Sequence, residues 1–177
     1  MKSIIDLRKE YDFDMYPSRQ DSWLRYFKRH TFDFNVFLES KGINLQRDYV
    51  WTLDQKRELI NSIIIRRHIP EISLINTIDK NDESKDIYLV IDGKQRLSAM
   101  FDFLDDKFTI VLEGEEYLFS QLPNDYQSAI SSHPVACMMV NEPWNNRITD
   151  DQKIAWFKFI NFAGTPQDIE HLNKISL

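Results

Sequence analysis

The stretch DIYLVIDGKQRLSAMFDFL, residues 86–104, contains the local signal on which the predicted fold depends. Its first half is rich in β-branched and aromatic residues, which is typical of a strand. Beyond the Asp-Gly pair at 92–93 the apolar side chains recur at helical spacing, on a face made of Leu97, Met100, Phe101 and Leu104. The chain therefore passes from a strand to a helix across Asp-Gly-Lys-Gln-Arg, which places an acid, a glycine and two cations at the helix N-terminus.

Strand and helix patterns alternate on both sides of this stretch. Residues 71–78, EISLINTI, and 86–91 predict two strands that form a hairpin-like pair or lie adjacent in a sheet. Residues 34–38, FNVFL, predict a strand before a turn at Lys41-Gly42. Further on, the patterns predict a hairpin at 108–119 turning at Glu113-Gly114, a short helix at 122–132, a buried strand at 134–140, and a longer helix from Thr149 that Gly164 ends. Hairpins mixed with interspersed helices indicate the α+β class rather than a doubly wound sheet.

Two segments carry the signature of a helix start. Thr52-Leu53-Asp54-Gln55 is a capping box, and the helix that follows ends before Pro70. Thr165-Pro166-Gln167-Asp168 has proline at the first helical position and predicts a final helix to Leu177.

The N-terminal part, residues 1–33, is polar and aromatic and has the weakest pattern. Within it, WLRYFKRH spaces Trp23, Leu24 and Phe27 as a short amphipathic helix does. We therefore divide the chain into an N-terminal extension, residues 1–33, and a domain, residues 34–177.

The composition limits the classes of protein that this chain can represent. The 177 residues carry a formal net charge of −6, and residues 101–125 hold seven acids against one lysine, so the remainder is balanced. This charge excludes a surface that is basic throughout but permits a local basic site. Cys137 is the only cysteine, which excludes an internal disulfide and predicts a buried thiol. No apolar span is long enough for a membrane, and we expect a soluble cytoplasmic protein.

Three polar clusters lie directly before a helix or in its first turn: Gln46-Arg47 with Tyr49 and Trp51, Asp92 to Arg96, and Asn161 to Thr165. A helix N-terminus presents free N–H groups and a partial positive charge, which suits a phosphate.

Each side chain in these clusters has a possible part in such a site. The two guanidinium groups are suited to bidentate contacts with phosphate oxygens, and Lys94 to a point-charge contact. Gly93 lets the backbone approach an anion, and the amides of Gln46 and Gln95 can orient a base, a ribose or a water. The alternative interpretation is structural: an Asp-Gly turn, solvated arginines, and Tyr49 and Trp51 filling the core.

Three ordered motifs in the chain resemble those of the N-terminal domain of GmrSD-type modification-dependent restriction enzymes, within the ParB/sulfiredoxin-like superfamily. Gln46, Arg47, Tyr49 and Trp51 match a Gln-Arg-x-Tyr-x-Trp segment. Asp92, Gly93, Gln95 and Arg96 match an Asp-Gly-Gln-Gln-Arg loop, in which Lys94 replaces the first glutamine. Asn161, Gly164, Thr165 and Pro166 match an Asn-x-x-Gly-Thr-Pro segment. The resemblance covers residues 34–177.

The resemblance implies a ParB-like α+β fold and the binding of a nucleoside triphosphate (NTP). In the restriction enzymes NTP hydrolysis licenses DNA cleavage, which a C-terminal HNH-type nuclease domain performs. The chain ends after the third motif, so we expect a stand-alone member of the phage type, in a bacterial host cell, that is no nuclease without a partner. Because the sequence has no Walker-type GxxxxGK[ST] segment, NTP use is of a non-P-loop kind.

On this hypothesis the residues divide into two groups. Asp92, as a helix cap or a Mg²⁺ ligand, and Gln95 are the candidate catalytic residues of a slow hydrolysis. The candidate nucleotide-binding residues are Gln46, Arg47, Gly93, Lys94, Arg96, Asn161 and Thr165. The cofactor is an NTP with or without Mg²⁺. The spacing of the histidines predicts no protein metal site.

A second hypothesis keeps the same scaffold without catalysis. Aromatic residues at 11–34 are interleaved with Arg19, Arg25, Lys28 and Arg29, as in surfaces that stack nucleic-acid bases or dock a partner protein. The alternative for this segment is a helix packed on the domain.

Overall fold

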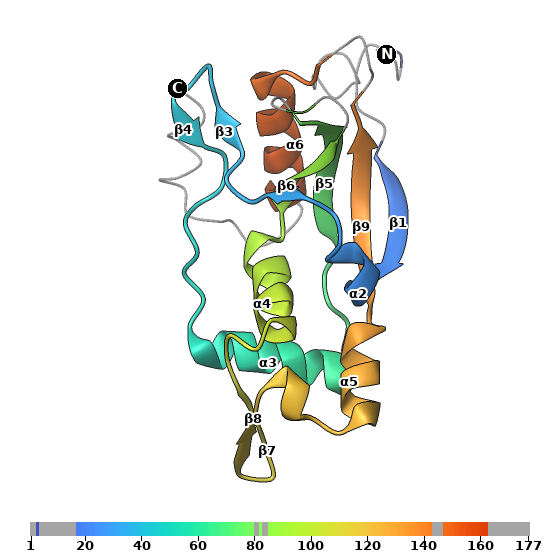
Figure 1. The fold of residues 1–177 in the computed structure, drawn as a ribbon. Helices are drawn as coiled ribbons and strands as arrows, with labels where there is room; N and C mark the ends of the chain where they lie inside the picture. The colour runs from blue at the N-terminus through green and yellow to red at the C-terminus, as the bar shows by residue number, and fades with distance from the viewer. Residues whose placement is uncertain (1–2, 4–16, 80–81, 83–84, 143–146, 163–177) are drawn as a thin grey trace.

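The computed structural model describes residues 3, 17–79, 82, 85–142 and 147–162. These residues form a mixed sheet with helices on both faces, together with two small hairpins (Figure 1). The predicted α+β class is confirmed. The predicted stop at Gly164 and the predicted helix at 165–177 lie outside the described residues.

The central sheet has five strands. Their order is β1 (Ser18–Trp23), β9 (Pro134–Asn141), β5 (Ile72–Ile78), β6 (Asp86–Asp92) and β2 (Phe32–Asp33). β5 pairs antiparallel with β6 and parallel with β9, while β1 is antiparallel to β9 and β2 is parallel to β6. The predicted pairing of 71–78 with 86–91 is therefore correct, and β9 provides the other neighbour of β5.

The remaining elements lie around this sheet. The helices are α2 (Leu24–Phe27), α3 (Leu53–Ile64), α4 (Lys94–Leu104), a 3-10 turn η1 (Phe119–Gln121), α5 (Asn124–Ser131) and α6 (Asp150–Phe162). The hairpins are β3 (Phe37–Leu38) with β4 (Ile43–Asn44), and β7 (Ile110–Leu112) with β8 (Glu115–Tyr117). Figure 1 shows α6 and the β3–β4 hairpin beside the sheet, and α3, α4 and α5 grouped near one end of it.

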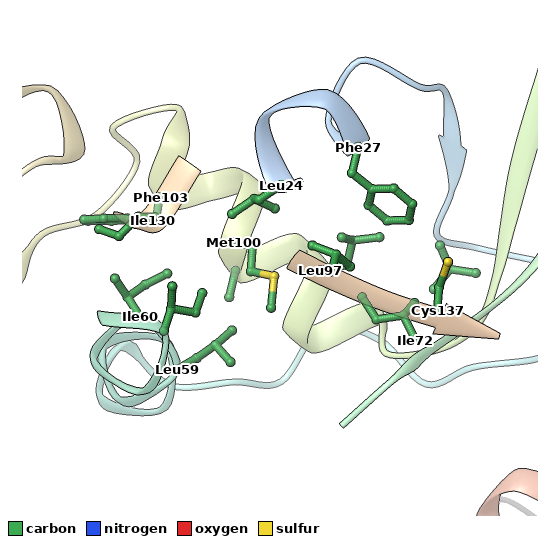
Figure 2. Packing of buried hydrophobic residues seen from close by; sticks show 14 of the residues in the cluster. Leu24, Phe27, Leu59, Ile60, Ile72, Leu97, Met100, Phe103, Ile130 and Cys137 are labelled. Atoms are coloured by element: carbon green, nitrogen blue, oxygen red, sulfur yellow. The ribbon is translucent and has the colours of Figure 1, made fainter. Parts of the chain in front are cut away.

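Two apolar clusters hold the layers together, one on each face of the sheet. Neighbouring residues of β6, Val90 and Ile91, belong to different clusters because side chains alternate along a strand. The larger cluster joins the sheet to α2, α3, α4 and α5, and Figure 2 shows Leu59 and Ile60 of α3 facing Met100 of α4. The smaller one joins the sheet to α6 and the β3–β4 hairpin.

Local signals in the sequence account for several boundaries. Thr52 is the N-cap of α3, and both bonds of its capping box with Gln55 are formed, as predicted. The β7–β8 turn has positive φ at both Glu113 (51°) and Gly114 (88°), the backbone conformation that a two-residue hairpin requires. Cys137 is buried in β9, which confirms its assignment to the core.

The predicted strand at 34–38 is wrong in extent. The N–H of Asn35 donates to the carboxylate of Asp33 (2.8 Å), and this Asx turn separates β2 from β3. Of the predicted amphipathic helix at 23–30, Leu24 and Phe27 are buried as expected. Trp23 instead ends β1 and is 48% exposed.

The predicted division at residue 34 remains a prediction, but the structure shows what precedes it. β1 and α2 both lie before residue 34, and β1 pairs along its whole length with β9. Leu24 and Phe27 belong to the larger apolar cluster. Residues 18–33 therefore contribute to the same sheet and core as the rest of the described chain.

Candidate functional site

A pocket of about 110 Å³ lies where β6 passes into α4. The segment between β4 and α3 and one residue of α6 complete its walls. The described residues that line it are Gln46, Arg47, Trp51, Asp92, Gly93, Lys94, Gln95, Arg96 and Phe157. Seven of the nine predicted site residues are in this set, so the fold brings the first two sequence motifs together.

The charge of this pocket is opposite in sign to that of the whole chain. Among the described lining residues, Arg47, Lys94 and Arg96 stand against a single carboxylate, that of Asp92, whereas the chain has a formal net charge of −6. The pocket therefore favours an anion.

Gly93 sets the geometry of the strand-to-helix junction. It is the N-cap of α4 with φ of +93°, a left-handed conformation that glycine adopts without strain, and no side chain caps the helix there. The predicted alternative that Asp92 caps α4 is therefore wrong. The first residues of this 11-residue helix line the pocket, and no side chain of the described residues caps its N-terminal backbone donors.

Arg96 is held in the pocket by two protein acceptors. Its Nη2 donates to Oδ2 of Asp92 (2.9 Å) and to the carbonyl oxygen of Glu71 (3.1 Å). Its Nε is buried and has no hydrogen-bond partner among the described residues. The guanidinium group is thus oriented by the protein and retains donor capacity.

Lys94 is the buried cation of the site, with a relative exposure of 6%. Its Nζ donates to Oδ1 of Asn35 (2.7 Å), a neutral acceptor in the Asx turn between β2 and β3. A buried ammonium group without a carboxylate partner is costly, and an anion in the adjoining pocket lowers that cost.

Gln95 bonds to backbone on three sides. The N–H groups of Val50 (3.0 Å) and Trp51 (3.2 Å) donate to its Oε1, and its Nε2 donates to the carbonyl of Asp48 (3.0 Å). Similarly, the amide of Gln46 donates to the carbonyl of Val90 in β6. Both glutamines therefore hold the segment 46–51 against the β6–α4 junction and position Trp51. Their action on a ligand stays a prediction.

Replacement of Gln95 by leucine should loosen this segment. The variant loses three hydrogen bonds to backbone, and we expect a loss of about 1–3 kcal/mol in the free energy of unfolding. Urea unfolding measures the loss, and amide hydrogen exchange should be faster at Val50 and Trp51. Gln127→Leu, which removes two side-chain bonds to the η1–α5 loop, is the control. Unchanged exchange at Val50 and Trp51 would contradict the positioning role.

Tyr49 has a buried hydroxyl without a hydrogen-bond partner among the described residues. Burial, together with the charge of Asp102, raises the pKa of Tyr49 to about 12. A raised pKa means that the neutral form stabilises the folded state below pH 10, and that this contribution is lost as the pH rises toward 12.

Tyr49→Phe should therefore be close to neutral at pH 7, because it removes an unpaired polar group. Above pH 10 the variant should lose less stability than the wild type. Thermal unfolding of both proteins between pH 7 and pH 12 measures the difference, and parallel curves over that range would refute it.

The other predicted residues have different outcomes. Arg47 is exposed, lines the pocket, and has no ion-pair partner among the described residues. Asn161 lies in the last turn of α6, and its amide donates to the carbonyl of Phe157 (2.7 Å). Phe157, one turn earlier, lines the pocket instead. Thr165 lies outside the described residues.

Two residues of the site were missed by the sequence reasoning. Phe157 belongs to the helical pattern of α6 and is indistinguishable from other core residues of that helix. Asn35 is the last residue of the sequence Asp-Phe-Asn, which signals an Asx turn. No local signal shows that its side chain accepts a hydrogen bond from Lys94.

The fold and the pocket together define a class: an α+β domain with a net-positive pocket at an Asp-Gly strand-to-helix junction, without a P-loop sequence. The model of one family, the N-terminal domain of the GmrSD restriction endonuclease, matches residues 40–175. The chain belongs to this family, as the motifs predicted. Comparison with curated proteins and with solved structures gives no significant match.

The described ranges also bear on membrane spans and metal sites. None of the helices there is both long and apolar enough to span a bilayer. Within the same ranges no three His, Cys, Asp or Glu side chains come together as metal ligands.

Proposed function

We propose that this chain binds a nucleoside triphosphate with its phosphates in the pocket at the β6–α4 junction. The observation that carries the proposal is the pocket's charge, since the described lining has three cations and one carboxylate beside a helix N-terminus that no described side chain caps. A helix N-terminus with arginine and lysine beside it is a common phosphate site. The family supports a role in restriction or defence, and we propose that the nucleotide controls that role.

The size of the pocket determines which part of the ligand it accepts. At about 110 Å³ it is well below the roughly 300–1,000 Å³ typical of sites for whole small molecules. It therefore suits phosphate groups, and the nucleoside must lie outside it. Arg96 and Arg47 would contact phosphate oxygens, with Lys94 providing charge and the N–H groups of α4 providing donors.

We expect NTP hydrolysis at this pocket to be slow because of the residues that line it. Among the described residues that line the pocket there is no serine, threonine or cysteine, so none of these side chains is suited to a covalent step. Asp92 has the one carboxylate in the described lining that could share Mg²⁺ with the phosphates, and it is paired with Arg96 (2.9 Å). Gln95 would have to leave its backbone partners to orient a water. The lining residues are therefore better suited to binding an NTP and stabilising the charge of its phosphates than to hydrolysing it.

Titration calorimetry with each NTP, with and without Mg²⁺, tests the proposal. We expect binding that weakens as salt increases, because the contacts are ionic. A parallel assay of phosphate release separates binding from hydrolysis. Absence of binding to every NTP at low salt would refute the proposal, and binding without phosphate release would refute hydrolysis alone.

A specific surface favours a second function, the binding of single-stranded nucleic acid. Trp23 and Tyr26 are 48% and 42% exposed, and their rings stack with centroids 5.8 Å apart. The guanidinium of Arg25 lies 4.8 Å from both ring centroids, and that of Arg29 lies 4.9 Å from Tyr26. Exposed rings beside arginines are the features that bind unpaired bases and phosphates.

Fluorescence anisotropy with a labelled oligonucleotide tests this second function. Trp23→Ala should weaken binding several-fold, whereas Phe37→Ala, at an exposed aromatic residue of the β3–β4 hairpin, should not. An affinity that does not fall with salt would count against it, since phosphate contacts release counterions.

A further inference from the structure

A second hollow of about 390 Å³ adjoins the phosphate pocket along α3. The residues that line it are Trp51, Gln55, Glu58, Leu59, Ser62, His68, Ile69, Pro70 and Arg96. Trp51 and Arg96 also line the phosphate pocket, so the two hollows meet at these side chains. We call the second hollow the α3 groove.

We propose that the α3 groove holds the base and ribose of the nucleotide whose phosphates lie at the β6–α4 junction. The inference rests on the proposed function and identifies the half of the ligand that the smaller pocket cannot contain. Trp51 lines both hollows and would stack on the base. Arg96 also lines both hollows and would lie where the ribose joins the phosphates.

Size and chemistry agree with a nucleoside. The groove falls within the roughly 300–1,000 Å³ range of small-molecule sites, unlike the phosphate pocket. Its lining combines apolar contacts from Leu59, Ile69 and Pro70 with polar side chains. A base has an apolar face and polar edges, and a ribose has hydroxyl groups, so this mixture suits both.

Charge sets the direction in which the nucleotide lies. The described lining of the α3 groove includes one arginine, Arg96, and one carboxylate, that of Glu58, which is paired with Arg67 (2.9 Å). The described lining of the phosphate pocket instead has two more cations than carboxylates. The negative end of the ligand therefore belongs in the pocket and its uncharged end in the groove.

Trp51 is fixed before any ligand arrives. Its backbone N–H donates to Gln95 Oε1 (3.2 Å), and its side chain packs against the larger apolar cluster. A side chain fixed in advance loses little conformational entropy when a base stacks on it. This also gives a reason for the glutamine at 95: it connects the β6–α4 junction to the wall of the nucleoside subsite.

Comparison of ATP or GTP with inorganic tripolyphosphate tests the inference separately from the proposed function. The wild type should bind an NTP about tenfold more tightly than tripolyphosphate, because base stacking adds to the phosphate contacts. Ser62→Trp, which fills the groove, should remove that preference and leave tripolyphosphate affinity unchanged. Ser128→Trp, on the exposed face of α5, is the control and should keep the preference.

The possible outcomes separate the two proposals. Equal affinity of the wild type for NTP and tripolyphosphate would refute the nucleoside site in the α3 groove but not the phosphate site in the pocket. A preference that survives in folded Ser62→Trp would also overturn it. Binding of neither ligand would refute the phosphate pocket itself. If Ser62→Trp melts early, His68→Trp replaces it, at an exposed residue that lines the α3 groove and not the phosphate pocket, with an expected loss of about tenfold for NTP alone.

Discussion

Arg96→Ala should weaken NTP binding by about 100-fold or more. The proposed site uses the guanidinium group for two charge-assisted hydrogen bonds to phosphate, each contributing roughly 1.5–3 kcal/mol, and every 1.4 kcal/mol is a factor of ten. Titration calorimetry at low salt measures the change. Arg96→Lys keeps the charge but loses the planar fork, and an intermediate loss of about tenfold is expected.

The control for Arg96 must separate binding from stability. Arg96→Ala also removes bonds to Asp92 and to the Glu71 carbonyl, so its melting temperature should fall. Arg147→Ala breaks another arginine–carboxylate pair, with Glu142 (3.0 Å), near the Ile78 end of β5. It should lower stability without changing NTP affinity. Equal affinity of Arg96→Ala and wild type would contradict the site.

Gly93→Ala should destabilise the fold more than a change at any other described glycine. At φ of +93° an alanine is strained by about 1–2 kcal/mol. Its Cβ would also lie 3.0 Å and 3.1 Å from the two Cγ atoms of Ile72, which is buried, so overpacking adds roughly 1–3 kcal/mol. Denaturant unfolding should show a total loss of about 2–5 kcal/mol.

Gly114→Ala is the matched control for Gly93. Its φ is +88° and a Cβ there meets nothing within 4 Å, so it reports the backbone strain alone. The difference between the two variants is the packing term. Ile72→Ala removes the obstructing atoms, and in that background the two glycine variants should cost nearly the same. Equal losses in the wild-type background would refute the packing argument.

Much of the local structure follows from residues that are neighbours in the chain. The capping box at Thr52, the positive-φ turn at Glu113-Gly114 and the change of period across Asp92-Gly93 each depend on a few adjacent residues. The free energy of each of these features depends on interactions between residues a few positions apart in the chain. The same locality explains the error at 34–38, where an Asx turn overrides a run of apolar residues.

The candidate site was only partly predictable, because its side chains serve distant backbone. Gln95 binds residues 44 to 47 positions earlier in the chain, and Gln46 binds Val90. A side-chain amide looks the same in the sequence whether it faces a ligand or a carbonyl. The motifs therefore identified which residues meet, but not that the two glutamines hold the segment carrying Trp51.

The sequence by itself determined the α+β class, the family, the strand-to-helix junction at 92–96 and the cations around it. Only the tertiary structure decided that β9 lies between β1 and β5, that Phe157 of α6 closes the pocket, and that Lys94 is buried beside Asn35. It also placed the α3 groove next to the phosphate pocket. The physical reason is range: periodicity, caps and turns act over a few residues, whereas a pocket forms where packing brings distant segments together.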